Sequence, residues 1–336
     1  MVEMIKVGLE NTPLVSVVMG VHNGASQIQT TLSSVFQQHG VDFEVIVVND
    51  GSTDATAQVL EKIATEARSL KIIHQPKNLG LTKALIAGCN AARGTFIARQ
   101  DLGDISLPGR LVKQCEFFES NSELAMVSCW TRTTGPQNEP LYETRRTAEP
   151  RQATHELQHC FAGPPHHGSV MFRREAYLKC HGYREQFYFS QDTDLWLRLT
   201  EIGLVGYVQA TLYEFQISRK GISSQFREAQ HELGLLAHKC AEARRRGKSE
   251  EQLLLEAQTY RPSVSRCVKP DLVAGDYFIG KCLARNGDLR GIEYLRRVVT
   301  SRPTKLGAWL GLSSLFLRNL FNLGLKVNHA SDRTGE

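Results

Sequence analysis

The stretch Phe43-Glu-Val-Ile-Val-Val-Asn-Asp-Gly-Ser-Thr-Asp54 decides the fold, because a short apolar run passes directly into a polar loop that contains glycine. The β-branched residues of the run are typical of a buried strand. Beyond the loop, apolar residues recur at the 3.6-residue spacing of a helix, at Val59, Leu60, Ile63 and Ala67. Strand, polar loop and helix in this order predict one unit of an α/β fold.

Further short apolar runs that predict strands lie on both sides of this stretch, at Val15–Val21, Lys71–His74 and Thr95–Ala98. Helical patterns separate these runs, so the strands must be joined by crossovers. We therefore expect a mostly parallel sheet with helices on both faces. Ligands of such sheets bind at the carboxyl ends of the strands, where the loops that begin at His22, Asn49 and Arg99 should meet.

Six motifs in a fixed order make the pattern specific: Val17–Gly24, Glu44–Asp54, Asn78–Lys83, Ala98–Leu111, His166–Arg173 and Ser190–Arg198. The first four are similar to the nucleotide-binding half of family 2 glycosyltransferases, and the last two resemble the acceptor half. The resemblance implies a GT-A-like fold over residues 13–225, divided into a nucleotide-sugar half (13–110) and an acceptor half (111–225). Residues 226–336 show only helical patterns and are expected to form a C-terminal extension.

The resemblance also implies which residues contact the nucleotide-sugar donor, namely Val21, Asn23, Asp50, Ser52, Lys83, Asp101 and Arg219. Asp50 also has a physical reason, because a carboxylate at a strand end can accept the N–H of a uracil ring. The alternative is an Asp-Gly turn in which Asp54 favours the start of the next helix. Lys83 is by itself more typical of a solvated helix.

The Asp101-Leu-Gly-Asp104 loop departs from the pattern of the family, which usually has Asp-x-Asp-Asp here. The resemblance implies a divalent ion, Mn²⁺ or Mg²⁺, that neutralises the diphosphate leaving group. Gly103 offers no carboxylate at the usual second position. Three alternatives remain open: Asp104 ligates the metal, Asp101 holds it together with phosphate oxygens, or metal dependence is weakened.

Direct displacement at an anomeric carbon needs a base within reach of the acceptor hydroxyl. Asp192 is the predicted catalytic residue, since it matches the base-bearing position of the family motif, with Gln191 in place of the usual Glu. Asp194 is the rival. Both carboxylates could instead stabilise the start of a helix through its dipole.

Composition indicates in which compartment the protein resides and which class of partner it is expected to bind. The eight cysteines are scattered without a C-x-x-C pair, and the N-terminus carries charges where a secretory segment would be apolar, so a cytoplasmic protein is expected. Residues 261–336 hold 13 Lys and Arg against 6 Asp and Glu, whereas the first 260 residues have a net charge of −2. This distribution disfavours nucleic acid as a partner of the main body.

The apolar segment 306–325 is flanked by Lys305 and Lys326, so residues 305–326 could contact the inner face of the cytoplasmic membrane peripherally. The alternative is a helix buried against the catalytic domain or in a dimer. A transmembrane helix over this segment is disfavoured, because it would contain Arg318 and two asparagines.

The favoured hypothesis is therefore an inverting glycosyltransferase that moves a sugar from a nucleotide-diphosphate donor, expected to be a UDP-sugar, to a hydroxyl of a glycan or lipid-linked acceptor. The role in cell-surface polysaccharide or lipopolysaccharide assembly follows from the resemblance alone. Two alternatives stay open: a catalytically impaired binding or scaffold subunit, suggested by Gly103, and a nucleotidyltransferase.

Overall fold

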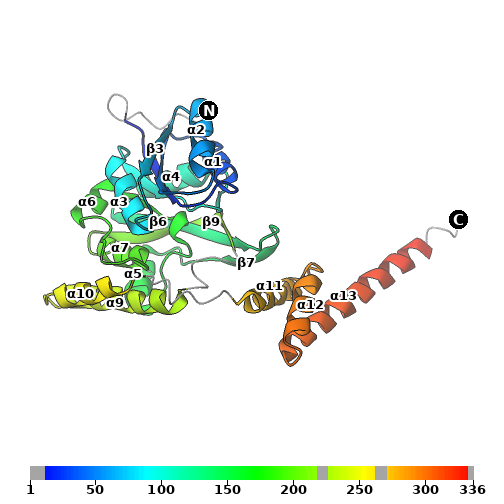
Figure 1. Cartoon of the computed structure of the whole chain (residues 1–336). Helices are drawn as coiled ribbons and strands as arrows, with labels where there is room; N and C mark the ends of the chain where they lie inside the picture. The colour runs from blue at the N-terminus through cyan, green and yellow to red at the C-terminus, as the bar shows by residue number, and fades with distance from the viewer. Residues whose placement is uncertain (1–11, 218–225, 262–270, 332–336) are drawn as a thin grey trace. The chain divides into compact units, whose positions relative to one another are not determined.

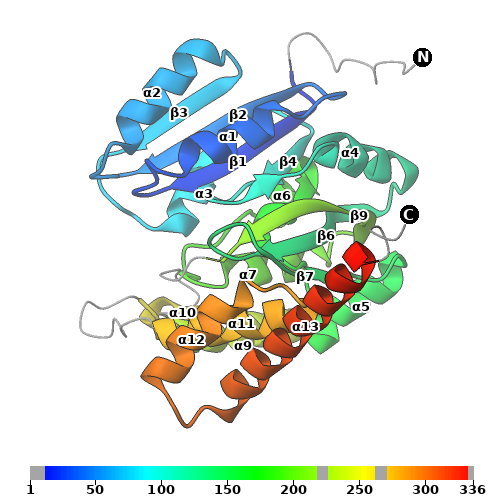
Figure 2. The same ribbon diagram turned by 90° about the vertical axis from the view of Figure 1, so that its right-hand side faces the viewer.

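The structure is a computed structural model that describes residues 12–217, 226–261 and 271–331. The chain forms two compact units. The larger contains residues up to 131, 143–215 and 226–266, and the smaller contains residues 132–142, 216–225 and 267–336. Figures 1 and 2 show the elements of both.

The first half of the sheet follows the predicted strand–helix alternation. Its strands and helices are β1 (Val15–Val21), α1 (Ile28–Phe36), β2 (Phe43–Asp50), α2 (Thr56–Glu66), β3 (Leu70–Gln75), α3 (Leu81–Ala91) and β4 (Phe96–Arg99). The pairs β2–β3, β1–β2 and β1–β4 are all parallel. The four strands predicted from sequence are confirmed.

The second half of the sheet is not parallel. Its elements are β5 (Ile105–Ser106), α4 (Arg110–Ser120), β6 (Leu124–Thr134), β7 (Pro140–Thr144), α5 (Pro150–Cys160), the short 3₁₀ helix η1 (His167–Ser169), β8 (Met171–Arg173), α6 (Arg174–Lys179), α7 (Gln191–Leu199) and β9 (Leu204–Gln216). The strand order is β3-β2-β1-β4-β8-β6-β9-β5, with β7 paired to β6. Because β8 is antiparallel to β4 and to β6, the sheet is mixed, and its parallel character is limited to the first four strands.

Side chains of the central strands alternate between two apolar cores, one on each face of the sheet. Val17 of β1 and Val45 of β2 pack into one core, while Val18 and Ile46 pack into the other. This alternation follows from the two-residue period of a strand. Burial on both faces explains why these strands read as continuous apolar runs.

The chain beyond β9 is helical in the described residues, as predicted: α9 (Arg227–Arg245), α10 (Glu251–Thr259), α11 (Leu272–Asn286), α12 (Gly291–Ser301) and α13 (Leu306–Ser331). The boundary predicted at residue 225 does not coincide with the division into units. Helix α9 packs its Leu233, Leu236 and Cys240 into a core of the larger unit. Helices α11, α12 and α13 instead form the smaller unit with the hairpin ends of β6 and β7.

Candidate functional site

The loops after β1 and β2 are tied together by Asn23. Its Oδ1 accepts the backbone N–H of Thr53 at 2.8 Å, and its own N–H donates to Ser52 Oγ at 3.0 Å. His22 Nδ1 donates to the carbonyl oxygen of Asp50 at 2.9 Å, which leaves Nε2 to accept from the Asn23 amide at 3.2 Å. Asn23 has a φ of 53°, in the left-handed region that asparagine tolerates. These two loops therefore form one preassembled edge.

Asp50, expected to contact the base, uses both carboxylate oxygens within the protein. Oδ1 accepts from the backbone N–H of Leu79 at 2.7 Å, and Oδ2 accepts from that of Gly80 at 2.8 Å. The side chain is almost completely buried. Asp50 thus positions the loop before α3, and a bound base would share a carboxylate that already has two donors.

Gly51 allows the loop after β2 to contact the loop before α3. Its φ is 61°, and a Cβ at this position would lie 2.3 Å from the carbonyl carbon of Lys77. No side chain fits, because real Cβ atoms do not approach backbone this closely. The Asp-Gly pair is therefore needed for packing as well as for the turn, and Asp54 accepts from the backbone N–H of Thr56 at 3.0 Å, at the start of α2.

Asp101 lies where the loop leaves β4, and a buried arginine holds it. Arg99 Nη2 donates to Asp101 Oδ1 at 2.6 Å, while the Arg99 side chain is fully buried. The Asp101 side chain is 31% exposed, and its Oδ2 has no hydrogen-bond partner among the described residues. This oxygen is available to a ligand.

Asp104 has a different environment from Asp101. It is buried, and its Oδ2 accepts the hydroxyl of Tyr213 at 2.8 Å. The same Tyr213 oxygen accepts the backbone N–H of Asp101 at 3.2 Å, so one tyrosine of β9 joins both ends of the loop. Between them Gly103 has a φ of 88° and donates its N–H to Thr31 Oγ1 at 2.9 Å. The structure gives Asp104 a role in holding the loop.

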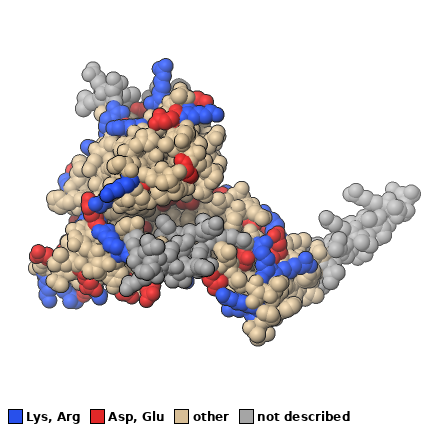
Figure 3. All heavy atoms as spheres, in the orientation of Figure 1, with Lys and Arg blue, Asp and Glu red and all other residues tan. Residues whose placement is uncertain are grey.

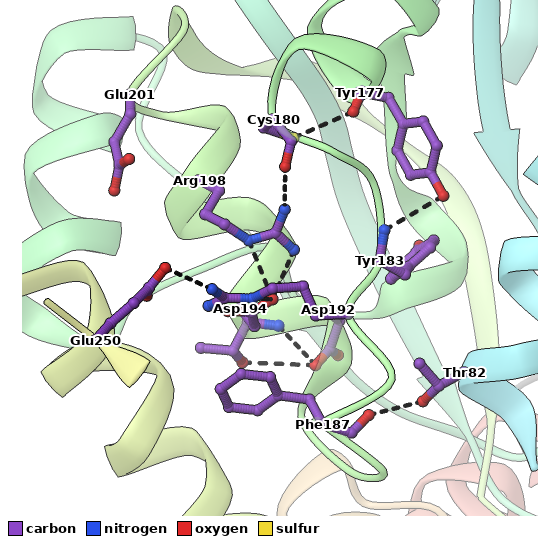
Figure 4. Close-up of polar contacts among 12 residues, drawn as sticks. Thr82, Tyr177, Cys180, Tyr183, Phe187, Asp192, Asp194, Arg198, Glu201 and Glu250 are labelled. Carbon is purple, nitrogen blue, oxygen red and sulfur yellow. Dashed lines mark hydrogen bonds and ion pairs between the residues drawn. The ribbon is translucent and has the colours of Figure 1, made fainter. Parts of the chain in front are cut away.

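The two acidic residues at the start of α7 differ sharply (Figure 4). Asp194 is buried and forms ion pairs with Arg184 and Arg198, and Arg198 also donates to the carbonyl oxygen of Cys180 at 2.6 Å. Burial alone would raise the pKa of Asp194, but the two guanidinium groups hold it below its ordinary value. Asp194 therefore stays ionised within a structural network.

Asp192 has no arginine or lysine in an ion pair among the residues that the structure describes. Its Oδ1 accepts the backbone N–H of Thr193 at 2.8 Å, and Oδ2 has no partner in the same described set. Burial raises the pKa of Asp192, and the negative charge of Asp101 raises it further. A partly exposed carboxylate with an available oxygen and a raised pKa is suited to accept a proton.

Two histidines line the region near Asp101. His167 Nε2 lies 2.6 Å from the Tyr183 hydroxyl, and burial lowers the pKa of His167 to about 3. His166 stacks on Phe215 with ring centroids 4.2 Å apart, and burial lowers its pKa to about 4. Both rings are therefore neutral at physiological pH. The ring of His167 also lies near α7, with its centroid 6.1 Å from that of the Trp196 ring.

The other predicted donor contacts are distributed unevenly. Val21 is buried at the end of β1, and Ser52 is held by Asn23 as described. Lys83 Nζ is 3.1 Å from Glu185 Oε2 in a half-exposed ion pair. Arg219 lies outside the described residues. The structure thus brings Asn23, Ser52 and Asp50 together at one end of the site and Asp101 and Asp192 into electrostatic contact at the other.

Sequence reasoning missed Arg99, Tyr213 and Tyr188. The first two organise the Asp101–Asp104 loop, and the ring of Tyr188 would lie 2.7 Å from a Cβ at Gly80, directly over the loop that Asp50 holds. Arg99 stood inside a quoted motif, so its position was a usable signal. Tyr213 and Tyr188 come from distant elements and carry no local signal that marks them.

The residues present fit a divalent cation only in part. Asp101 offers one available carboxylate oxygen, Asp104 is committed to Tyr213, and Gly103 offers none. Within the described residues, no three His, Cys, Asp or Glu side chains are grouped so that they could hold a metal ion. The protein by itself does not supply a complete coordination shell, so we derive no step of the reaction through a metal.

A sheet whose first four strands are parallel and whose second half is antiparallel, with polar loops at the carboxyl ends of the parallel strands, is the fold of the GT-A glycosyltransferases. Residues 16–180 match the family described as "Glycosyl transferase family 2". The chain belongs to glycosyl transferase family 2.

Curated relatives agree with this assignment. Putative glycosyltransferase EpsE of Bacillus subtilis (strain 168) is 32% identical over 211 residues, which cover 61% of this chain and 74% of the relative. O-antigen biosynthesis glycosyltransferase WbnJ of Escherichia coli is 30% identical over 187 residues, which cover 55% of this chain and 71% of the relative.

Solved structures show the same fold. Mannosyltransferase PcManGT from Pyrobaculum calidifontis, in complex with GDP-Man and Mn²⁺, has a TM-score of 0.54 at 19% identity and covers 94% of this chain and 88% of its own. TarS 1–349 of S. aureus, in complex with UDP-GlcNAc, has a TM-score of 0.56 at 16% identity and covers 92% of each chain. At these identities the likeness concerns the fold alone.

Proposed function

We propose that this chain is an inverting glycosyltransferase that uses a nucleotide-diphosphate sugar and acts in the assembly of a cell-surface polysaccharide. The observation that carries the proposal is the contrast between Asp192 and Asp194, because among the described residues Asp192 forms no ion pair and its pKa is raised, whereas Asp194 pairs with two arginines. In a single displacement, Asp192 would accept the proton of the acceptor hydroxyl as that oxygen attacks the anomeric carbon.

The donor end of the site supports a nucleotide ligand. Asn23, Ser52 and the loop positioned by Asp50 form a fixed, polar edge, and Asp101 offers an available carboxylate oxygen. We propose UDP as the nucleotide, in keeping with the UDP-GlcNAc bound to the structural neighbour TarS. The acceptor is proposed to be a hydroxyl of a glycan or of a lipid-linked glycan, by analogy with the named O-antigen relative.

A divalent ion that Asp101 would hold is part of the proposal, since the structural neighbour PcManGT is a complex with GDP-Man and Mn²⁺. When bound, such an ion would neutralise negative charge on the leaving diphosphate. The phosphate oxygens would have to supply the ligands that Gly103 and Asp104 do not. Arg99 orients the Asp101 carboxylate whether or not the ion is present.

The decisive experiment is calorimetric titration with UDP and GDP, each with and without Mn²⁺, on wild type, Asp101→Asn and Asp192→Asn. We expect UDP to bind wild type more tightly with Mn²⁺, Asp101→Asn to lose that enhancement, and Asp192→Asn to bind normally. Asp50→Ala is a poor probe, because it also removes both contacts to the Leu79–Gly80 loop. If neither UDP nor GDP binds wild type, with or without Mn²⁺, the result favours the alternative of a catalytically impaired binding or scaffold subunit.

Transfer itself is tested with Asp192→Asn and UDP-sugars of defined anomeric configuration. Nuclear magnetic resonance of the product with a glycan acceptor should show the inverted configuration for wild type and no product for the variant. A product with retained configuration would contradict the direct displacement.

A further inference from the structure

The last helix, α13, has two faces of opposite character. One face packs into the smaller unit, where Ala308, Leu312 and Leu315 are buried against α11 and α12. Large apolar side chains on the rest of the helix are 43–75% exposed, at Leu306, Trp309, Leu310, Phe316 and Leu317.

These five exposed side chains share one side of the helix. At 3.6 residues per turn their positions fall within an arc of about 120°, on the side opposite to Leu315. Single exposed apolar residues are ordinary, but a continuous stripe of them marks an interaction surface. Trp309 is held in place, because its Nε1 donates to the carbonyl oxygen of Pro303 at 2.8 Å. We call these five residues the α13 stripe.

Cations border the α13 stripe. The guanidinium carbon of Arg296, on α12, lies 5.9 Å from the ring centroid of Phe316. Lys305 directly precedes Leu306, and its Nζ lies 4.9 Å from the ring centroid of Tyr277. Neither of these two cations forms an ion pair within residues 12–217, 226–261 and 271–331.

Other cations of the same unit are neutralised. Arg297 pairs with Asp276 and Glu293, and Arg302 pairs with Asp271. Figure 3 shows basic side chains on the visible face of these helices. The charges left without a carboxylate include those that flank the apolar stripe, which is the arrangement of a helix that lies in the interface of an anionic bilayer.

We propose that the α13 stripe is a membrane-binding surface that inserts into the headgroup region of a bilayer containing anionic phospholipid. Arg296 and Lys305 would meet the lipid phosphates. A symmetric dimer through the same surface would bring like charges together, because an isologous interface places the same patch on both sides. None of the helices in the described chain is long and apolar enough to span a membrane. The surface is independent of nucleotide binding.

The test is flotation of the full-length protein with vesicles of phosphatidylcholine alone and of phosphatidylcholine mixed with phosphatidylglycerol, at low and high salt. We expect binding to the anionic vesicles, weakened by salt. Leu310→Gln/Leu317→Gln should weaken it at least tenfold by removing inserted side chains, and Arg296→Gln or Lys305→Gln about fivefold each.

The matched control is Leu178→Gln/Leu255→Gln, since both leucines are 52% exposed but lie on α6 and α10. This variant should bind anionic vesicles like wild type, and circular dichroism melting should show that all variants fold. No vesicle binding by wild type, or equal binding by the stripe and control variants, would overturn the proposal. So would a dimer in vesicle-free solution that the stripe variant dissociates, because the stripe would then bind a second copy.

Discussion

Two carboxylates two residues apart have been given opposite tasks by their neighbours. Asp194 is enclosed by Arg184 and Arg198, whereas Asp192 faces no cation in the described structure and interacts with the negative charge of Asp101. The covalent chemistry of the two side chains is identical. Their surroundings alone make one a structural anion and the other a candidate base.

Asp192→Asn should reduce turnover by about 10²–10⁴-fold, because an amide cannot accept the acceptor proton. The affinity for UDP should stay within about twofold, since the Asp192 side chain contacts neither the Asn23 loop nor the Asp50 loop. Steady-state kinetics together with calorimetry separate the two effects. Wild-type turnover in the variant would remove Asp192 from the mechanism.

The pH dependence of turnover should have an acid limb set by Asp192. The base must be deprotonated to act, and burial together with Asp101 raises its pKa above the ordinary value of 3.8. Activity is therefore expected to fall with decreasing pH before an ordinary aspartate would protonate. The profile of kcat/KM against pH measures this limb, and a profile flat down to the ordinary aspartate pKa would contradict the assignment.

Asp194→Ala should destabilise the fold by about 3–5 kcal/mol, because it leaves the buried guanidinium of Arg198 without a carboxylate and leaves Arg184 with Glu250 alone. The pKa of Asp194 is depressed, so its contribution to stability is present above its unfolded pKa and is lost as the pH falls through the folded value. Urea unfolding measures the loss. Glu175→Gln, which breaks an exposed pair with Lys179, is the control and should leave the urea midpoint close to that of wild type.

At the scale of elements, hydrogen bonds from Arg99 and Tyr213 hold the loop between β4 and β5 in place. Gly103 lies at its turn with a left-handed backbone. The family's usual aspartate at this position would bring a Cβ to 2.9 Å from the amide nitrogen of Gln27, which would have to move. The local backbone therefore favours glycine, which is a physical reason for the missing carboxylate.

Gly103→Ala should cost about 1–2 kcal/mol through the left-handed backbone, whereas Gly103→Asn should cost less because asparagine tolerates that region. Thermal unfolding compares the two variants. Gly103→Asp, combined with the Mn²⁺ titration, shows whether an added carboxylate tightens the metal-dependent binding of UDP. Equal stability of the alanine variant and wild type would show that the loop readily changes its backbone.

The helices and strands could be predicted from the sequence better than the contacts between residues of the candidate site. The strands around Val18 and Ile46 and the described helices after β9 follow from local periodicity, because apolar residues recur there at the spacing of a strand or of a helix. The antiparallel half depends on pairings between distant segments, such as β8 with β4, that leave no local pattern. For the same reason, the sequence marked Asp50 and Asp101 but not their long-range partners Leu79 and Tyr213.

At the scale of the whole molecule, the two units are interleaved in sequence. The hairpin residues 132–142 belong to the unit of α11–α13, although they lie between segments of the larger unit. Leu141 is buried with Ile279, Leu283 and Tyr294, and the Tyr294 hydroxyl donates to buried Glu139 at 2.5 Å. The helices therefore complete the core of a hairpin that the earlier chain supplies.

Removing residues 267–336 should expose Leu141 and leave the Glu139 carboxylate without Tyr294. We expect the truncated chain to aggregate or to bind a hydrophobic dye, whereas a variant that also replaces residues 132–142 with a short turn should stay soluble. Light scattering and dye fluorescence compare the two. If the two truncated chains scatter light and bind the dye equally, the hairpin 132–142 does not need the helices to cover its apolar side chains.

The interleaving also limits how such a protein can be recombined. A gene fusion made at a single junction after residue 266 would transfer the helices but leave behind the hairpin that they cover. A functional chimera must exchange two separate segments together, so the helical unit is inherited as a paired insertion and tail.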